Sequence, residues 1–187
     1  MNKNYDIDHM TFNADIFILP GLGNSGEQHW QSIWEREHGF TRIEQSEWDA
    51  PVKDTWIKTI DDALQNHDLS RVILIGHSLA CSTIAFWAAK YNRIIKGALL
   101  VGPSDTEADT YPPGTTGFKP MPVNKLPFPA ITVFSTDDYY VTTNRAEYFA
   151  SCWGTKMVNI GNAGHINVTS GYGDWDEGLK FLQELDA

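Results

Sequence analysis

The stretch Arg71-Val72-Ile73-Leu74-Ile75-Gly76-His77-Ser78-Leu79-Ala80-Cys81 decides the fold. Its first half is a continuous run of apolar, mostly β-branched residues, as expected of a strand buried on both faces of a parallel sheet. Residues 79–91 contain no Gly or Pro and are rich in Ala, Ile and aromatic residues, so they predict a buried helix. The stretch therefore indicates a strand that passes directly into a helix.

The junction, Gly76-His77-Ser78-Leu79-Ala80, follows the nucleophile-elbow pattern. Small neighbours permit a tight turn that leaves the serine oxygen exposed at the helix N-terminus. There, unpaired backbone N–H groups and the helix dipole favour developing negative charge. Serine is also a common N-cap residue, so ordinary helix capping is the alternative explanation of Ser78.

Length and composition indicate one globular domain. The chain has 187 residues, of which 42% are hydrophobic and 20% charged. Its formal net charge of −10 would repel nucleic acid. No apolar run approaches the ~18 residues needed to span a bilayer, and the N-terminus lacks a signal peptide's apolar stretch. We therefore expect a cytoplasmic protein with a polar tail at 1–13 and one domain at 14–187, without membrane or nucleic-acid partners.

Apolar strands alternate with amphipathic helices along the chain. The pattern predicts strands at 15–19, 41–45, 71–75, 96–101, 130–135 and 155–160, and helices at 27–38, 54–66, 79–91, 143–153 and 174–185. Such alternation implies a parallel sheet of about six strands with helices on both faces. Residues 102–129 hold seven of the nine prolines, so we expect an irregular segment there that serves as a minimal lid or binding loop.

The loops after the strands carry the candidate catalytic residues. Ligands of an open α/β sheet bind beyond the carboxyl ends of its strands. Those loops hold a Gly-rich turn at 21–26, Ser78, the pair Asp137 and Asp138, and His165. A serine hydroxyl becomes a good nucleophile when an imidazole accepts its proton and a carboxylate holds that imidazole in the right tautomer. The order serine, acid, histidine therefore favours catalysis over capping at Ser78.

His165 is the best-placed base among the six histidines, because it follows a strand and adjoins a glycine. His77 lies inside the elbow, where we expect its ring to point away from the serine. His29 neighbours the Gly-rich turn and either lines the site or packs beside the next residue, a tryptophan. Packing is the simpler explanation of His29.

The backbone N–H groups of Leu22 and Leu79 are the candidates for an oxyanion hole, which stabilises the tetrahedral intermediate of acyl transfer. Spacing alone does not choose between Asp137 and Asp138 as the acid. The two cysteines have no metal-ligand spacing and are too few for a disulfide scaffold, so we expect both to pack.

Nearly the whole chain after the tail resembles the retinoblastoma-binding protein 9/YdeN family of small serine hydrolases, within the α/β-hydrolase superfamily. The residues that carry the resemblance are Pro20-Gly21 with Ser25 and His29-Trp30, Gly76-His77-Ser78-Leu79, Ser135-Thr136-Asp137-Asp138-Tyr139-Tyr140-Val141 with Arg145-Ala146, Trp153-Gly154, Gly161-x-x-Gly164-His165-Ile166-Asn167 and Ser170-Gly171-x-Gly173-x-Trp175. Two positions depart from the family. Ala80 replaces the glycine common at the end of the elbow, and Tyr139 stands where proline is frequent.

The resemblance implies a single-domain α/β-hydrolase fold, with a strand order like 2-1-3-4-5-6. It also implies an esterase-like triad of Ser78, Asp138 and His165, without a metal or an organic cofactor. We therefore predict a serine hydrolase that cleaves a small ester, thioester or activated amide through an acyl-enzyme on Ser78. Its partner would be a small-molecule acyl substrate. Candidates for lining the substrate site are Gly21, Asn24, His29, Tyr139 and Tyr140.

The alternative is a protein-interaction module that keeps the hydrolase fold and binds a protein partner. Exposed members of the seven tryptophans could form its surface. The aromatic loop residues Tyr111 and Phe118 also have two explanations. They either line an acyl pocket or pack within the loop.

Overall fold

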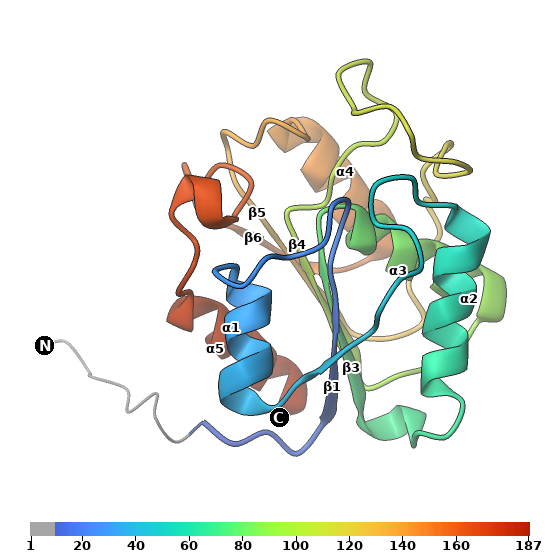
Figure 1. Cartoon of the computed structure of the whole chain (residues 1–187), viewed down its shortest axis with the longest axis vertical. Helices are drawn as coiled ribbons and strands as arrows, with labels where there is room; N and C mark the ends of the chain where they lie inside the picture. The colour runs from blue at the N-terminus through green and yellow to red at the C-terminus, as the bar shows by residue number, and fades with distance from the viewer. Residues whose placement is uncertain (1–9) are drawn as a thin grey trace, which may run out of the picture.

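A parallel sheet of six strands forms the centre of the computed structural model, which describes residues 10–187 (Figure 1). The strands are β1 (Asp15–Leu19), β2 (Thr41–Arg42), β3 (Val72–His77), β4 (Gly97–Val101), β5 (Ala130–Phe134) and β6 (Lys156–Asn159). Their order, β2-β1-β3-β4-β5-β6, confirms the predicted topology. The predicted tail falls largely on residues 1–9, outside the described residues.

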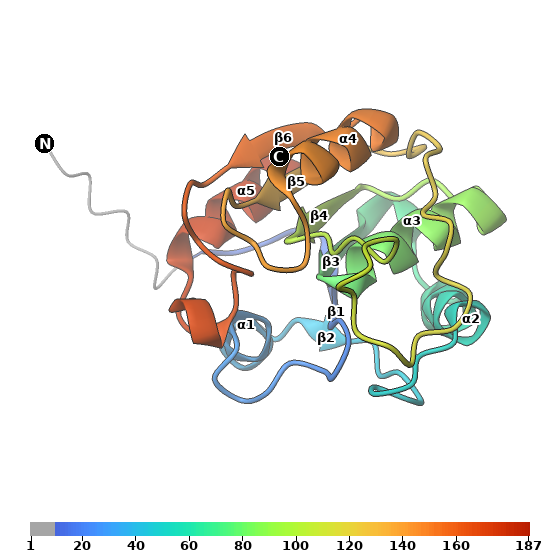
Figure 2. The same cartoon turned by 90° about the horizontal axis from the view of Figure 1, so that it is seen from above.

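Helices cover both faces of the sheet (Figure 2). They are α1 (Trp30–His38), α2 (Lys53–Leu64), α3 (Leu79–Tyr91), α4 (Thr143–Trp153) and α5 (Asp176–Asp186). Side chains of β3 alternate between two cores: Ile73 and Ile75 pack with α1 and α5, whereas Leu74 packs with α2, α3 and α4. Because both faces are buried, this strand is apolar from Val72 to Ile75, as its sequence predicted.

Most element boundaries differ from the prediction by one or a few residues, those of α1, α2 and β2 among them. Helix α1 begins at Trp30 and not at residue 27, because the His29 side chain caps it by accepting from the Gln31 N–H. Helix α2 begins at Lys53, which places Asp54 in the first turn and not at the N-cap. Strand β2 has two residues only. The predicted spans of α3 and α4 are confirmed.

The proline-rich segment 102–129 contains no helix or strand. It first passes over the carboxyl ends of the strands and then returns along the side of the molecule to the start of β5 (Figure 1). The Thr116 N–H donates to Pro51 O, Thr116 O accepts from the N–H of Lys53 at the start of α2, and the Leu126 N–H donates to Trp153 O. No helix among residues 10–187 is long and apolar enough to cross a bilayer.

The expectation of exposed tryptophans is wrong. Six of the seven are buried at 4% exposure or less, and Trp48 is half-buried. The tryptophans fill the two faces of the sheet, where large rings supply much of the buried apolar area. They therefore offer no broad aromatic surface to a protein partner.

Gly76 sets how closely α3 packs on β3. A Cβ atom at this position would lie 2.8 Å from Ile84 Cδ1 and 3.2 Å from the carbonyl carbon and oxygen of Ala80. The Ala80 methyl group, which replaces a common glycine, is itself buried without such a conflict in the packing. The helix thus tolerates a methyl group at residue 80 but needs the strand to carry none at residue 76.

We predict that Gly76→Ala lowers the free energy of unfolding by about 1–3 kcal/mol, because the added methyl group overpacks the contact between α3 and β3. Urea denaturation measures the change. Gly26→Ala is the matched control, since a Cβ atom there would meet nothing within 4 Å. Equal stability of the two variants would contradict the prediction.

Candidate active site

Ser78 occupies a strained turn between β3 and α3. Its backbone has φ 57° and ψ −122°, a conformation that residues other than glycine rarely adopt. The Ser78 N–H donates to Val101 O at 2.9 Å, which ties the turn to the neighbouring strand β4. The hydroxyl makes no capping bond to α3. Helix capping therefore does not explain this serine.

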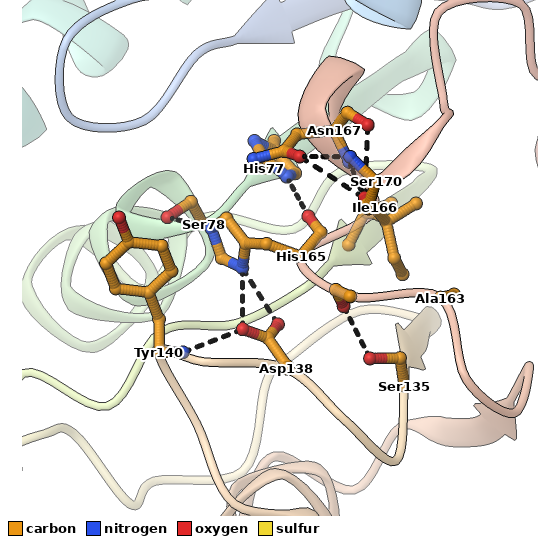
Figure 3. A network of polar contacts seen from close by, with 12 residues as sticks. His77, Ser78, Ser135, Asp138, Tyr140, Ala163, His165, Ile166, Asn167 and Ser170 are labelled. Atoms are coloured by element: carbon orange, nitrogen blue, oxygen red, sulfur yellow. Dashed lines mark hydrogen bonds and ion pairs between the residues drawn. The ribbon is translucent and has the colours of Figure 1, made fainter.

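His165 and Asp138 lie beside Ser78 (Figure 3). His165 Nε2 is 2.8 Å from Ser78 Oγ, and His165 Nδ1 is 2.8 and 2.9 Å from the two carboxylate oxygens of Asp138. The Asp138 side chain is completely buried, and the Tyr140 N–H donates to its Oδ1 at 2.8 Å. Since Asp138 accepts from Nδ1–H, the lone pair of Nε2 faces the serine hydroxyl.

The neighbouring Asp137 bonds to backbone N–H groups and not to the imidazole of His165. Its Oδ1 accepts the N–H groups of Gly164 at 2.8 Å and Ala163 at 2.9 Å, in the segment 163–166 that we call the histidine loop. The hydrogen bond from Gly164, followed by that from Ala163, lowers the pKa of Asp137 below its ordinary value. The structure thus places only Asp138 against the His165 ring.

The Gly-rich loop after β1 approaches the elbow closely. A Cβ atom at Gly21 would lie 2.8 Å from Ser78 Cβ and 3.1 Å from the Leu79 nitrogen, so only glycine permits this approach. Leu79 is the first residue of α3, where backbone N–H groups lack a partner within the helix. The next residue of the loop, Leu22, lines the same cavity as Ser78.

A cavity of about 160 Å³ opens at Ser78. It is lined by Gly21, Leu22, Asn24, His29, His77, Ser78, Tyr111, Pro112, Tyr140, His165 and Asn167. Tyr139, predicted as a lining residue, is not part of this wall. Its side chain is 75% exposed, whereas the ring of Tyr140 lies 4.6 Å from that of His165. Phe118 packs in the core with Trp56 and Leu79.

Sequence reasoning missed three lining residues and one contact. Pro112, Asn167 and His77 were not proposed for the cavity, although Asn167 stands two residues after His165 in the motif that carries the resemblance. His77 does more than pack, because its Nε2 lies 2.9 Å from the backbone oxygen of His165. No pattern in the sequence signals that contact, since it joins residues far apart in the chain.

The sequence matches the serine hydrolase family over residues 16–184. The chain belongs to this family. A protein described as a YdeN-like hydrolase from Pectobacterium atrosepticum is 32% identical, with a TM-score of 0.79 and 94% of each chain covered. No curated protein matches the sequence.

Two solved structures of lower identity share the fold. The ydeN gene product of B. subtilis is 16% identical, with a TM-score of 0.73 and coverage of 92% of this chain and 98% of that chain. Carboxylesterase CesB of Bacillus subtilis is 15% identical, with a TM-score of 0.63 and coverage of 91% and 84%. The α/β-hydrolase fold and the prediction of a YdeN-like serine hydrolase are confirmed.

This serine hydrolase holds two further histidines near His165. Ring centroids of His29 and His77 are 4.8 Å apart, and those of His77 and His165 are also 4.8 Å apart. Burial, followed by the charges of His165 and Arg42, lowers the pKa of His29 to about 4. Burial also lowers the pKa of His77 well below its ordinary value, and the neighbouring histidines add to the effect. Both rings therefore stay neutral near pH 7.

We predict that the free energy of unfolding of the serine hydrolase falls as the pH falls from 6.5 to about 4. In this interval His29 binds a proton in the unfolded chain, where its pKa has the ordinary value of 6.5, but not in the folded chain, where its pKa is about 4. Acid then favours unfolding by up to about 1.4 kcal/mol per pH unit at this residue.

Urea denaturation of the wild type and His29→Asn at about pH 7 and about pH 5 measures the effect. Asparagine can still cap α1 but does not titrate, so the variant should lose less stability in acid. Equal losses in the two proteins would show that His29 does not contribute.

Proposed function

We propose that Ser78, His165 and Asp138 form a catalytic triad that hydrolyses a small ester, thioester or activated amide. The observation that supports it is the unbroken line of contacts from Ser78 Oγ to His165 Nε2, and from His165 Nδ1 to the buried carboxylate of Asp138. These distances fall in the range needed for proton transfer. None of these three side chains must move before the reaction starts.

In the acylation step, Ser78 Oγ attacks the acyl carbon while His165 Nε2 takes the hydroxyl proton. The negative charge of Asp138 stabilises the imidazolium that forms. The carbonyl π bond opens onto oxygen, and this oxyanion accepts hydrogen bonds from the N–H groups of Leu22 and Leu79. When the intermediate collapses, the bond to the leaving group breaks, and the leaving group takes the proton from His165.

In the deacylation step, water replaces the leaving group. His165 Nε2 accepts a proton from the water as its oxygen attacks the acyl carbon, and the same N–H groups hold the second oxyanion. The bond from the acyl carbon to Ser78 Oγ then breaks. His165 returns the proton to Ser78, and the carboxylic acid leaves.

The cavity at Ser78 favours a short acyl group. Its volume of about 160 Å³ is well below the ~300–1,000 Å³ of pockets that hold drug-sized ligands. Tyr111 and Pro112, from the segment 102–129, close one side of it. A long alkyl chain would have to displace this segment or extend into solvent.

We predict that Ser78→Ala and His165→Ala abolish labelling by a fluorophosphonate probe. The two aspartates offer a matched pair: Asp138→Asn should lower kcat by about 10⁴, as expected when the imidazole loses its correct tautomer. Asp137→Asn should lower kcat by roughly ten-fold or less, because this side chain bonds to the N–H groups of the histidine loop and to the Ser135 hydroxyl, and not to the His165 ring. Equal labelling of wild type, Ser78→Ala and His165→Ala would contradict the triad.

We also predict that kcat/KM for p-nitrophenyl esters falls by roughly ten-fold or more from butyrate to octanoate, because the cavity cannot enclose the longer chain. Initial rates at low substrate concentration measure the ratio. Tyr111→Ala removes part of the wall and should raise the relative rate on octanoate. A wild type that prefers octanoate would contradict the proposed preference while leaving the triad intact.

A further inference from the structure

The histidine loop has a backbone shape that its own residues do not favour. Gly164 and Ile166 flank the catalytic histidine with φ values of 53° and 48°, both in the left-handed region. Isoleucine is poorly suited to this region because its branched Cβ crowds the backbone. Such a conformation persists only where surrounding groups hold it.

Three consecutive carbonyl groups of this loop each accept a hydrogen bond from a side chain. Gly164 O accepts from Ser135 Oγ at 2.5 Å, His165 O from His77 Nε2 at 2.9 Å (Figure 3), and Ile166 O from Trp30 Nε1 at 2.9 Å. The loop therefore has side-chain donors on its carbonyl groups, in addition to Asp137 on its N–H groups.

The donors belong to rigid and buried parts of the molecule. His77 is the last residue of β3, Trp30 is the first residue of α1, and Ser135 directly follows β5. Trp30 and Ser135 are 0% exposed and His77 is 6% exposed. A carbonyl group that lost one of these donors would lie in a place where water cannot readily replace it.

His77 connects the turn that carries Ser78 with the loop that carries His165. It directly precedes Ser78, so its own backbone leads into the turn that presents the nucleophile. A carbonyl oxygen only accepts, so Nε2 of His77 must carry the proton in its bond to His165 O. The low pKa of the buried ring keeps it neutral, so it retains this one tautomer near pH 7.

We infer that His77 and Trp30 are positioning residues, whose ring N–H groups fix the His165 and Ile166 carbonyls and thereby hold His165 Nε2 at bonding distance from Ser78 Oγ. This inference rests on the proposed function and extends it to residues that bond to the loop backbone and not to the reacting atoms. A displacement of about 1 Å between reacting groups lowers the rate by roughly 100-fold, so a modest shift of the loop is enough to matter.

The first test compares two variants of His77. His77→Phe keeps a ring of similar size but removes the N–H donor, and we expect kcat to fall roughly 10- to 100-fold while KM stays within about three-fold. His77→Gln carries an amide nitrogen near the position of Nε2 and should restore kcat to within about three-fold of wild type.

The second test uses α1. Trp30→Phe removes the indole N–H and should lower kcat by roughly ten-fold. Trp34→Phe is its matched control. Trp34 is also buried in α1, where its ring packs against Trp30 and Trp175, but no hydrogen bond joins it to the described histidine loop, so its loss should lower stability without lowering kcat. Urea denaturation of each variant separates loss of fold from loss of rate.

A spectroscopic measurement reports the position of His165 without turnover. We expect the proton between His165 Nδ1 and Asp138 to give a strongly deshielded resonance in the ¹H NMR spectrum. This resonance should shift or broaden in His77→Phe and Trp30→Phe, and stay unchanged in Trp34→Phe. If His77→Phe does not fold, Trp30→Phe and the recovery of rate in His77→Gln decide the question.

Folded His77→Phe and Trp30→Phe with wild-type kcat and an unchanged resonance would overturn the positioning role. A wild type without Ser78-dependent turnover would instead overturn the proposed function, and the resonance would still show whether the two ring N–H groups hold His165. The two failures are therefore distinguishable.

Discussion

The left-handed turn at Ser78 constrains everything around it. A serine at φ 57° is unfavourable by roughly 1–2 kcal/mol relative to ordinary backbone, so the surrounding packing must impose it. Strand β3 lies between β1 and β4 and is buried on both faces, while α3 packs against it at Gly76. Gly21 completes the enclosure from the loop after β1. These contacts leave the hydroxyl facing the His165 imidazole and the cavity.

A parallel sheet brings the other groups to the same edge. The loops after β1, β5 and β6 each end beside the turn after β3, so residues distant in sequence meet without any long insertion. The adjacent aspartates then divide two tasks. Asp138 orients the His165 ring, and Asp137 holds the backbone on which that ring is mounted. The loop directs the two aspartate side chains to different partners, and this gives them different roles.

The sequence predicts the spans of α3 and α4 through their apolar periodicity, and the strand order through the resemblance to a known family. It does not separate Asp137 from Asp138, since consecutive residues in a loop point in directions that only the backbone torsion angles define. The start of α1 was missed because histidine is an unusual N-cap residue. Tyr139 and the tryptophans show the same limit, as aromatic composition says little about whether a ring is buried or exposed.

The long sequence separation of the contacts to the histidine loop has a consequence for folding. Trp30 and Ile166 are 136 positions apart, and His77 and His165 are 88 apart. The base therefore has its native orientation only after the first helix, the central strand and the last loop have assembled. An intermediate that retained most of the sheet but released α1 would lack an ordered base, so hydrolytic competence belongs to the cooperative native state and not to a subdomain.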